Sequence, residues 1–341
     1  MLISLGIIGG TGYTGKKLLQ FGANHPKVKN ITVYGNNSAG NRLLNLFPEL
    51  MNTVEDSNIL SVDDISFEHD VYFVALPHGE ALNYIPELIK KGKKVIDLGG
   101  DYRFDDPVEY EKWYKIEHNS PTLLNEKKYG LADYYDIDYI HTNLIANPGC
   151  YPTSVLLSVL PFIENFSESI NTISTCSYSG TSGAGKSAKP EMLLSEMDGN
   201  VKAYNVNNHR HQPEIAQELK KAGLLADYSI TTHLLPVAIG IYSTTTIKLN
   251  KQIAAELINE SYNIKYAASK FVRLRQIPPS LTWVVGTNFC DINVSVKNNT
   301  VIITSAIDNL IKGASGQALQ NMNKMFDFDE TSGIINNGVA K

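Results

Sequence analysis

A glycine-rich segment directly after the first apolar run constrains the fold more than any other part of the sequence. Leu5–Ile8 is apolar, Gly9–Gly15 contains four glycines, and Lys16–Phe21 has the pattern of a helix start. Such a strand-to-helix turn lets the backbone approach a pyrophosphate closely and directs the helix N–H groups toward it. The spacing Gly10-x-Gly12-x-x-Gly15 satisfies the dinucleotide fingerprint, although a tight structural turn can also require such glycines. Seven consecutive residues are therefore candidate cofactor ligands: Gly9, Gly10, Thr11, Gly12, Tyr13, Thr14 and Gly15.

The two halves of the chain have different patterns. In the first half, short apolar runs at Ile31–Tyr34, Val71–Leu76 and Lys94–Leu98 accompany helical stretches such as Glu80–Lys91, which predicts βαβ units and a parallel sheet. In the second half, longer runs with alternating polarity predict a largely antiparallel sheet with one wetter face. These runs are Ile173–Tyr178, Ile230–Val237, Tyr242–Leu249, Phe289–Val296 and Val301–Ile307.

This change of pattern predicts an α/β dinucleotide-binding domain over residues 1–148 and an α+β catalytic and dimerisation domain over residues 149–307. A final helical pattern, Asn309–Met325, is long enough to pack back on the first domain, so residues 308–341 are expected to return there.

Composition narrows the classes of protein. The net charge of −5 over 341 residues argues against a nucleic-acid partner or an anionic membrane surface. The sequence has no run of about 18 apolar residues, the length that would predict a membrane span. The first residues resemble a buried strand and not a leader peptide. Three cysteines without metal-ligand spacing predict neither a disulfide framework nor a metal site, and fit a reducing, cytoplasmic compartment.

The segment after the second strand bears on which dinucleotide binds. An NAD-preferring site usually places an acid about 20 residues after the glycine turn, but no Asp or Glu precedes Glu49. Ser38, Gly40 and Arg42 offer a hydroxyl, a free backbone and a cation that suit a 2′-phosphate. NADP(H) is therefore predicted, the alternative being a solvated loop.

A second glycine-rich segment, Gly180–Ser187, matches the Walker A pattern GxxxxGK[ST]. The run before it is rich in Ser and Thr, unlike the apolar central strand of a P-loop fold. Pro190 also falls where the P-loop helix would already be running. We expect this loop to surround a substrate anion instead of ATP.

Cys150 is the candidate nucleophile. Asn147-Pro148-Gly149-Cys150 joins a short strand, Leu144–Ala146, to an apolar helix, so the thiol falls near a helix N-terminus. The positive potential there lowers a thiol pKa from about 8.5 and favours the thiolate. Cys176 and Cys290 lie inside apolar β runs and are expected in the core.

A thiolate mechanism needs a proton partner, and His209-Arg210-His211 supplies candidates. Pro213 is expected as the first residue of the following helix, which places these side chains in the loop that enters it. In an acidic chain such a run is suited to surround an anion. Arg103, which follows another sheet strand, is a second candidate anion holder or else a surface ion pair.

With these motifs in place, the chain resembles the N-acetyl-γ-glutamyl-phosphate reductase family, which is related to aspartate-semialdehyde dehydrogenase. The matching stretches occur in order over nearly the whole chain. They are Gly9–Gly15, Ser38–Gly40, Leu76–Gly79, Asp101–Phe104, Tyr129–Leu131, Asn147–Ser154, Ser182–Lys186, His209–Ile215 and Asp308–Gln317. One segment, Tyr34–Asn37, departs from the family because it lacks the basic or hydroxyl residues expected there.

The resemblance implies a glyceraldehyde-3-phosphate dehydrogenase-like fold, NADP(H), an acyl-phosphate substrate and a homodimer or homotetramer in an arginine-biosynthesis pathway. Cys150 would form a thioester that accepts a hydride, and His209 would supply the proton, with His211 in reserve. Further cofactor contacts are implied for Pro77, His78, Ser182, Gly183 and Asn309. Substrate contacts are implied for Arg103, Asn147, Arg210, His211 and Glu214.

Three alternatives stay open at this point. One is an ATP-binding module on Gly180–Ser187. Another is a protein that senses a dinucleotide without catalysis and would tolerate loss of Cys150. The third is a reductase of a related acyl phosphate, aspartyl or aminoadipyl, because the residues alone do not fix the length of the substrate chain.

Overall fold

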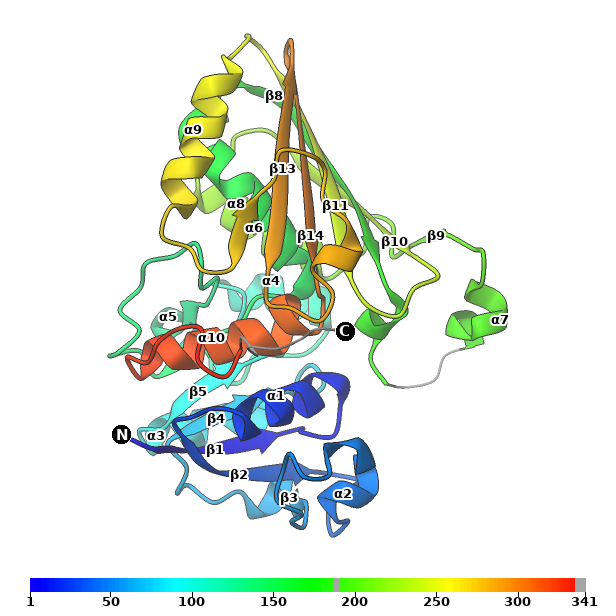
Figure 1. Cartoon of the computed structure of the whole chain (residues 1–341). Helices are drawn as coiled ribbons and strands as arrows, with labels where there is room; N and C mark the ends of the chain where they lie inside the picture. The colour runs from blue at the N-terminus through cyan, green and yellow to red at the C-terminus, as the bar shows by residue number, and fades with distance from the viewer. Residues whose placement is uncertain (187–189, 335–341) are drawn as a thin grey trace. The chain divides into compact units, whose positions relative to one another are not determined.

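The computed structural model describes residues 1–186 and 190–334 (Figure 1). The chain divides into two compact units. Unit 1 comprises Met1–Pro148 together with the segment that begins at Ala314, and unit 2 comprises Gly149–Gly313. The sequence placed the domain limits at residues 148 and 307, whereas unit 2 of the structure extends to Gly313.

Unit 1 is built on a sheet whose pairings are all parallel within the described residues, in the order β3-β2-β1-β4-β5-β7-β6. Its strands are β1 (Ile3–Ile8), β2 (Val28–Gly35), β3 (Leu60–Ser61), β4 (Val71–Val74), β5 (Lys94–Asp97), β6 (Lys128–Tyr129) and β7 (Leu144–Ala146). Strands β1 and β4 are buried along their whole length, as parallel strands covered on both faces should be. The parallel sheet expected from the first half is confirmed. Its carboxyl edge is where loops that bind ligands gather in such folds.

Short helices and turns complete unit 1. They are α1 (Tyr13–Ala23), α2 (Leu43–Leu46), α3 (Ile85–Lys90), α4 (Pro107–Tyr114), α5 (Leu123–Glu126) and α10 (Gly316–Met325), with 3-10 turns η1 (Pro48–Leu50), η2 (Val62–Asp64) and η3 (Ala81–Asn83). The helix expected over Glu80–Lys91 is split into η3 and α3, with Pro86 in the first turn of α3, where its missing N–H costs nothing. Helix α10 packs beside α1, and a π-helical turn, η8 (Ile311–Ser315), precedes it.

Unit 2 contains a mixed sheet in the order β12-β13-β14-β11-β8-β10-β9. Its strands are β8 (Ile170–Ser179), β9 (Lys202–Tyr204), β10 (Tyr228–Leu234), β11 (Ile241–Leu249), β12 (Val272–Leu274), β13 (Cys290–Lys297) and β14 (Thr300–Ile307). Four of the six described pairings are antiparallel, which confirms the largely antiparallel expectation. Strand β10 ends at Leu234, three residues before the predicted Val237.

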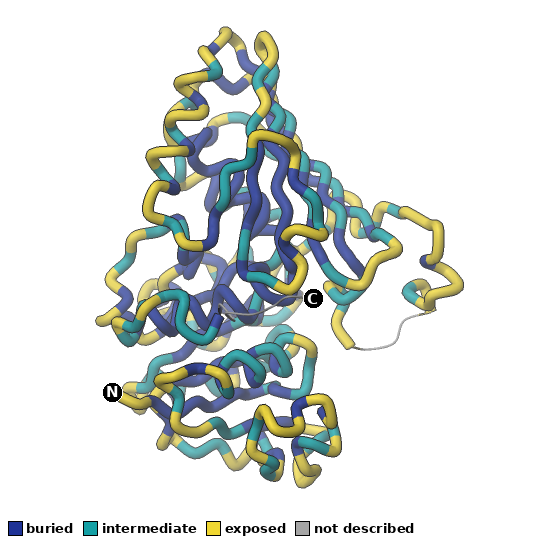
Figure 2. The backbone as a smooth tube through the Cα atoms, in the orientation of Figure 1, coloured by how far each residue is buried: buried dark blue, intermediate teal, exposed yellow. Residues whose placement is uncertain are grey.

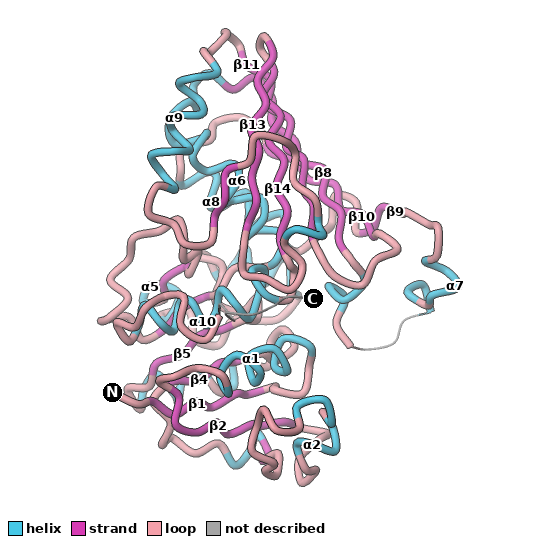
Figure 3. Tube along the Cα trace, in the orientation of Figure 1, coloured by secondary structure: helices cyan, strands magenta, loops and turns pink. Residues whose placement is uncertain are grey.

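The helices of unit 2 lie on one side of this sheet (Figure 3). They are α6 (Cys150–Phe166), α8 (His211–Lys221) and α9 (Ala255–Tyr266), while α7 (Leu194–Met197) lies in a mostly exposed segment beside β9 (Figure 2). Along β11 buried residues alternate with half-buried or exposed ones, so one face of the sheet is covered and the other is wetter. Short 3-10 turns η4 (Ser167–Ser169), η5 (Thr181–Ala184), η6 (Pro190–Met192) and η7 (Leu281–Trp283) complete the unit.

Buried hydroxyl groups explain the Ser- and Thr-rich strands under α6. Ser154 on α6 bonds Ser243 at 3.0 Å and Ser305 at 2.9 Å, and Thr175 bonds Thr245 at 2.8 Å. Each hydroxyl is paired, so its burial carries no large desolvation penalty. These paired hydroxyls join α6 to the sheet strands.

Helix α6 also contains a proline. Pro161 has no N–H for the carbonyl of Leu157, four residues earlier, and such a loss ordinarily kinks a helix. The hydroxyl of Tyr266 donates to that carbonyl, and Tyr262 donates to Ser158 at 2.6 Å. Helix α9 therefore satisfies backbone groups of α6 with two tyrosines.

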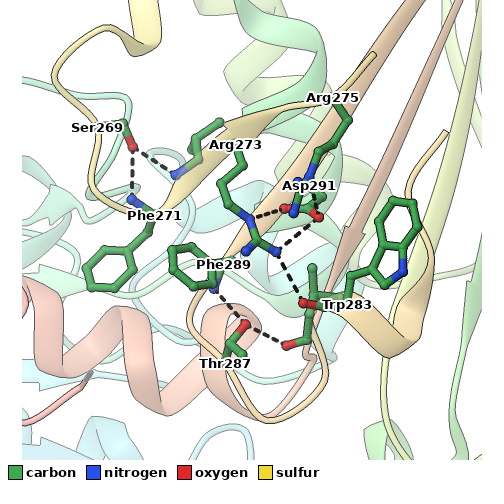
Figure 4. Close-up of polar contacts among 10 residues, drawn as sticks. Ser269, Phe271, Arg273, Arg275, Trp283, Thr287, Phe289 and Asp291 are labelled. Carbon is green, nitrogen blue, oxygen red and sulfur yellow. Dashed lines mark hydrogen bonds and ion pairs between the residues drawn. The ribbon is translucent and has the colours of Figure 1, made fainter. Parts of the chain in front are cut away.

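An ion-pair cluster closes the β12 edge of the unit 2 sheet (Figure 4). The carboxylate of Asp291, on β13, is fully buried and accepts from Arg273 Nε, Arg273 Nη2 at 3.0 Å and Arg275 Nε at 2.8 Å. Arg273 also lies over the Phe289 ring, 4.0 Å from its centroid, and donates to the carbonyl of Trp283 at 3.1 Å. The cluster attaches the loop before β13 to the sheet.

No described helix is long and apolar enough to span a membrane.

Candidate active site

In the glycine turn after β1, three glycines pack closely against neighbouring atoms and the fourth faces open space. Gly9 has φ +80°, and a Cβ there would lie 2.4 Å from the carbonyl oxygen of Ala75. A Cβ on Gly10 or on Gly15 would also meet neighbouring atoms, whereas a Cβ on Gly12 would meet nothing within 4 Å. Gly12 is also the N-cap of α1, whose first N–H groups have no acceptor within the helix. The turn thus leaves room for a ligand on the side that carries free donors.

The segment after β2 contains a partner that sequence reasoning missed. Arg42 donates from Nε to Asp56 at 2.9 Å and forms a 2.8 Å ion pair with it through Nη2, while Asp56 also accepts from the Leu44 N–H. Ser38 lies beside Gly35, and Gly40 has φ +83° with open space around it. Arg42 is therefore present where a 2′-phosphate is expected, but its guanidinium already holds a carboxylate.

A second loop at the carboxyl edge of the sheet follows β4 and contains Pro77 and His78. Pro77 is exposed, and the His78 ring lies 4.8 Å from the ring of Tyr114. The Ala75 N–H donates to the carbonyl of Ile8 at 2.8 Å, which places the start of this loop beside the glycine turn. The structure thus brings these two predicted cofactor segments together within unit 1.

The segment after β5 contains Arg103, which is buried. Its Nε donates to the carbonyl of Asn147 at 2.9 Å and its Nη2 to the carbonyl of Leu98 at 2.8 Å. The Asn147 side chain, also fully buried, accepts from Asn321 Nδ2 at 3.1 Å. Arg103 is therefore not the surface ion pair of the alternative interpretation. These two hydrogen bonds hold the ends of β5 and β7.

Asp97, at the end of β5, carries an unusual carboxyl group. Its Oδ1 accepts from the Gly99 N–H at 2.9 Å, but its buried Oδ2 has no hydrogen-bond partner within 3.5 Å among the described residues. Burial, together with the nearby carboxylate of Asp101, raises the pKa of Asp97 to about 7.

In unit 2, Cys150 is the first residue of α6, as predicted from the sequence. Its N-cap, Gly149, donates its N–H to Glu214 Oε1 at 2.9 Å, and Glu214 is buried in the first turn of α8. A Cβ on Gly313 would lie 2.8 Å from the Cys150 Cβ, so only glycine allows this approach. The thiol is half-buried and lies at the positive end of a 17-residue helix.

Two tyrosines surround the ring of His209. The Tyr151 ring meets it edge-on at 5.1 Å between centroids, the Tyr204 ring lies at 5.4 Å, and the two tyrosine hydroxyls bond each other at 2.8 Å. Burial, aided by the charge of Arg210, lowers the pKa of His209 to about 4. The ring is therefore neutral at neutral pH.

The other residues of the His-Arg-His run lie at the start of α8. The helix begins at His211, two residues before the predicted Pro213, because Arg210 already has helical backbone angles as the N-cap. Arg210 is exposed, and the His211 ring lies 5.0 Å from that of His209. The structure thus brings Cys150, both histidines and Glu214 together around the first turns of α6 and α8.

The Walker-like loop does not have P-loop geometry over its described residues, and Ser187 lies outside them. A short 3-10 turn, not an α-helix, follows β8. The Thr181 and Ser182 N–H groups donate to the carbonyls of Val237 and Ala238, each at 3.0 Å, so they are not directed at a phosphate. The ATP-binding alternative is therefore wrong, and the Thr181 and Ser182 N–H groups are already used within unit 2.

Asn309 connects this loop to its neighbours. Its Oδ1 accepts from the Gly240 N–H at 2.7 Å, and its Nδ2 donates to the Ser182 hydroxyl at 3.1 Å. A Cβ on Gly183 would lie 3.9 Å from that same Nδ2. The three predicted cofactor residues Ser182, Gly183 and Asn309 thus form one cluster.

Sequence reasoning missed Tyr204, Gly313 and Asp101. Tyr204 and Gly313 lie far along the chain from the motif that they contact, and only the fold brings them close. Asp101 lies inside a matching stretch, and an acid directly after two glycines at the end of a strand was the available signal. No described group of three or more His, Cys, Asp or Glu side chains is arranged to hold a metal ion.

Each of the two units matches a known protein family. Residues 4–141 match the semialdehyde dehydrogenase NAD-binding domain, and residues 150–309 match the semialdehyde dehydrogenase dimerisation domain. Among solved structures, aspartate semialdehyde dehydrogenase II from Vibrio cholerae in complex with ASA has a TM-score of 0.74 at 15% identity, covering 96% of this chain and 99% of that one. The Candida albicans aspartate semialdehyde dehydrogenase with NADP has a TM-score of 0.68 at 15% identity, with coverage of 96% and 99%. The fold predicted from the sequence is confirmed.

Closer relatives share much more sequence. An N-acetyl-gamma-glutamyl-phosphate reductase of Methanocaldococcus jannaschii is 42% identical over 341 residues, covering 98% of each chain. The enzymes of that name from Pelotomaculum thermopropionicum and Vesicomyosocius okutanii are 41% and 40% identical, with coverage of 99% and 98% of each chain. With a cysteine at the start of α6, two histidines at the start of α8 and a glycine turn after β1, the chain belongs to the N-acetyl-γ-glutamyl-phosphate reductase family.

Proposed function

We propose that the chain catalyses the NADPH-dependent reductive dephosphorylation of N-acetyl-γ-glutamyl phosphate to the 5-semialdehyde. The placement of Cys150 at the N-terminus of α6, beside the histidines that enter α8, carries this proposal. Names of relatives that cover nearly the whole chain support the choice of substrate.

Cys150 acts as the nucleophile. The potential of the α6 N-terminus favours its thiolate, which attacks the acyl carbon and expels inorganic phosphate to leave a thioester. When bound, NADPH would supply the hydride that reduces this thioester. The tetrahedral oxyanion then collapses: its electron pair re-forms the carbonyl while the carbon–sulfur bond breaks, which releases the aldehyde and the Cys150 thiolate with no net change in protons.

His209 is the proposed proton partner. Its Nδ1 accepts from the His211 N–H at 3.2 Å, so the neutral ring carries its proton on Nε2. A neutral imidazole held this way donates a hydrogen bond from Nε2 to the tetrahedral oxygen and so stabilises its negative charge. His211 and Arg210 then shape the anion pocket, with His211 the alternative proton partner, and Glu214 steadies the turn before Cys150.

The cofactor is proposed to bind along the glycine turn and the Pro77–His78 loop. Gly12, where a side chain would find open space, and the free donors of α1 fit a pyrophosphate. We assign NADPH over NADH from Ser38, Gly40 and Arg42. The pairing of Arg42 with Asp56 makes the preference modest, because the same guanidinium serves two anions. Ser182, Gly183 and Asn309 are assigned to the cofactor from the family resemblance.

Arg103 and Asn147 are assigned to the substrate on the same grounds. The Arg103 contacts with backbone carbonyls hold the side chain in one orientation, which favours recognition of a phosphate by a preorganised guanidinium.

The assay that tests the function is phosphate-dependent reduction of NADP⁺ with N-acetylglutamate semialdehyde. Aspartate semialdehyde and N-acetyl-aminoadipate semialdehyde are run beside it, and each aldehyde is also tested with NAD⁺. We expect the highest kcat/KM with the first aldehyde and NADP⁺. A higher value for either other aldehyde would assign the chain to the related reaction instead.

Replacing Cys150 by Ser tests the covalent step. We expect turnover to fall by several orders of magnitude, because the hydroxyl is a far weaker nucleophile, while NADPH affinity measured by nicotinamide fluorescence stays the same. Near-normal turnover in C150S would exclude the thioester mechanism and restore the dinucleotide-sensing alternative.

We further propose a homodimer or homotetramer in the cytoplasm. Unit 2 matches a dimerisation domain, and the wetter face of its sheet is opposite α6. A reducing compartment keeps the catalytic thiol free. Light scattering on the purified chain distinguishes monomer, dimer and tetramer.

A further inference from the structure

We infer that Asp101 is a positioning residue that holds the loop after β4 in the conformation that binds the nicotinamide dinucleotide. The inference deepens the proposed function and depends on it, because that function assigns Pro77 and His78 to the cofactor.

The carboxylate of Asp101 gathers donors from two separate segments. The Gly79 N–H lies 2.9 Å from both Oδ1 and Oδ2, and the Ala81 N–H also donates to this carboxylate. From α4, the Tyr110 hydroxyl donates to Oδ1 at 2.9 Å. Asp101 is fully buried, so these bonds act without competition from water.

The geometry of the loop explains why it needs such an anchor. Gly79 has φ +87°, and a Cβ there would lie 2.6 Å from Ile116 Cδ1, so the chain turns sharply at this point. Two N–H groups, at Gly79 and Ala81, then point to the same place. Converging N–H donors form an anion site, and in this structure the anion is a side chain of the protein itself.

Asp101, the anchor of the loop, is itself held in place by its neighbours. Its backbone carbonyl lies 2.9 Å from His118 Nε2. The neighbouring Gly100 packs against Tyr114 and His78, because a Cβ at Gly100 would lie 2.3 Å from the Tyr114 hydroxyl and 3.0 Å from His78 Nδ1. Contacts from α4 and the segment after it, through Tyr114 and His118, therefore help to set the position of the carboxylate.

The loop held by Asp101 borders the glycine turn. Ala75, at its start, donates to Ile8, and its carbonyl oxygen would lie 2.4 Å from a Cβ on Gly9. A shift of Pro77 and His78 therefore changes the space beside the turn that we assign to the pyrophosphate. Loss of the anchor should weaken dinucleotide binding before it affects any other step.

Arg103 lies two residues away, and its Nε and Nη2 donate to the carbonyls of Asn147 and Leu98. These two hydrogen bonds do not involve the Asp101 carboxylate, so they remain when that carboxylate is replaced. Substitution of Asp101 should therefore act on the cofactor, while the affinity for the second substrate stays close to that of the wild type.

The test replaces Asp101 by Asn in the full chain. An amide keeps one acceptor oxygen but presents an NH₂ to one of the two N–H donors, so at least one of these hydrogen bonds is lost. We expect the NADPH dissociation constant, measured by nicotinamide fluorescence, to rise about tenfold, the change associated with a buried hydrogen bond to a charged group. The KM for the semialdehyde and kcat at saturating cofactor should stay within about twofold to threefold of the wild type, a split that general loss of structure does not produce.

Two further variants complete the test. Tyr110→Phe removes one donor and keeps the ring, so it should raise the same constant by a smaller factor, and it carries the test if D101N does not fold. Asp106→Asn is the matched control, because Asp106 is exposed and caps α4 through the Val108 N–H.

Wild-type NADPH affinity in both D101N and Y110F would overturn the inference and leave the proposed function standing. So would an equal rise in KM for cofactor and aldehyde. A wild-type chain that binds neither NADPH nor NADH would overturn the proposed function and the inference with it.

Discussion

The tautomer of His209 follows from the backbone of the turn that enters α8. The His211 N–H is directed at Nδ1, and the Tyr151 and Tyr204 rings lie edge-on against the imidazole. A charged imidazolium at this position would lose both its hydration and the hydrogen bond from His211. The ring therefore resists protonation well below the ordinary pKa of 6.5.

This burial predicts a dependence of stability on pH. The pKa of His209 is about 4 in the folded chain and 6.5 in the unfolded chain. Between these values the unfolded chain binds a proton that the folded chain does not, so stability falls as the pH falls from about 6.5 to about 4. The contribution is about 2–3 kcal/mol. Denaturant unfolding across this range should show that His209→Asn loses less stability than the wild type on acidification.

Comparison of the wild type with H209N removes the contribution of Asp97 to the pH dependence of stability. Its raised pKa makes the folded chain bind the extra proton, so its contribution has the opposite sign and is the same in both proteins. If the free energy of unfolding changed with pH equally in wild type and H209N over this range, His209 would not be buried as a neutral ring.

The His209→Asn variant should also lower kcat by about 10²–10⁴, whereas His211→Asn should act mainly on the KM of the phosphorylated substrate.

At the scale of single elements, the turn from β1 to α1 separates two uses of glycine. A Cβ on Gly10 would lie 2.6 Å from Val33 Cγ1 on β2, inside the packed core of unit 1. A Cβ on Gly12 would meet no atom of the chain, and φ at Gly12 is −80°. One glycine is required by the fold, and the other leaves space for the ligand.

Alanine at each position tests this distinction. Gly10→Ala should destabilise the chain by about 1–3 kcal/mol, because a packed core does not absorb a methyl group without strain. Gly12→Ala should leave the melting temperature nearly unchanged and raise the NADPH dissociation constant at least about tenfold, since the methyl group occupies the approach of the pyrophosphate. Normal NADPH affinity in G12A would show that the pyrophosphate lies elsewhere.

Elements with local signals could be predicted from the sequence, and contacts between distant segments could not. The glycine turn, the start of α6 at Cys150 and the parallel sheet all follow from patterns within a few residues. The hydrogen bond from Gly79 to Asp101 spans 22 residues, and the Tyr151–Tyr204 bond spans 53. The pairing of Arg42 with Asp56 likewise depends on a loop that returns to the strand end, which no local pattern specifies.

At the scale of the whole molecule, the chain passes from unit 1 to unit 2 after Pro148 and returns at Ala314. The returning segment is an integral part of unit 1. In α10, Asn321 Nδ2 donates to Gly130 at 2.8 Å, and Asn323 Oδ1 bonds His25 Nε2 at 2.8 Å. These amides are fully buried, so each meets a polar group of unit 1 that would otherwise lack a partner.

Truncation tests whether unit 1 depends on this return. A chain ending at residue 313 keeps the glycine turn, the loop after β4 and Asp101, yet it leaves the His25 ring and the Gly130 carbonyl without their α10 partners and exposes the surface of α1 against which α10 packs. We expect it to bind no NADPH and to lose the cooperative unfolding of unit 1. A chain ending at residue 334 is the control and should bind as the full chain does. In the full-length chain, Asn321→Ala should cost about 1–3 kcal/mol of stability, because it leaves a buried carbonyl without its donor. Wild-type NADPH affinity in the chain ending at residue 313 would show that residues 1–148 are a complete dinucleotide-binding domain without α10.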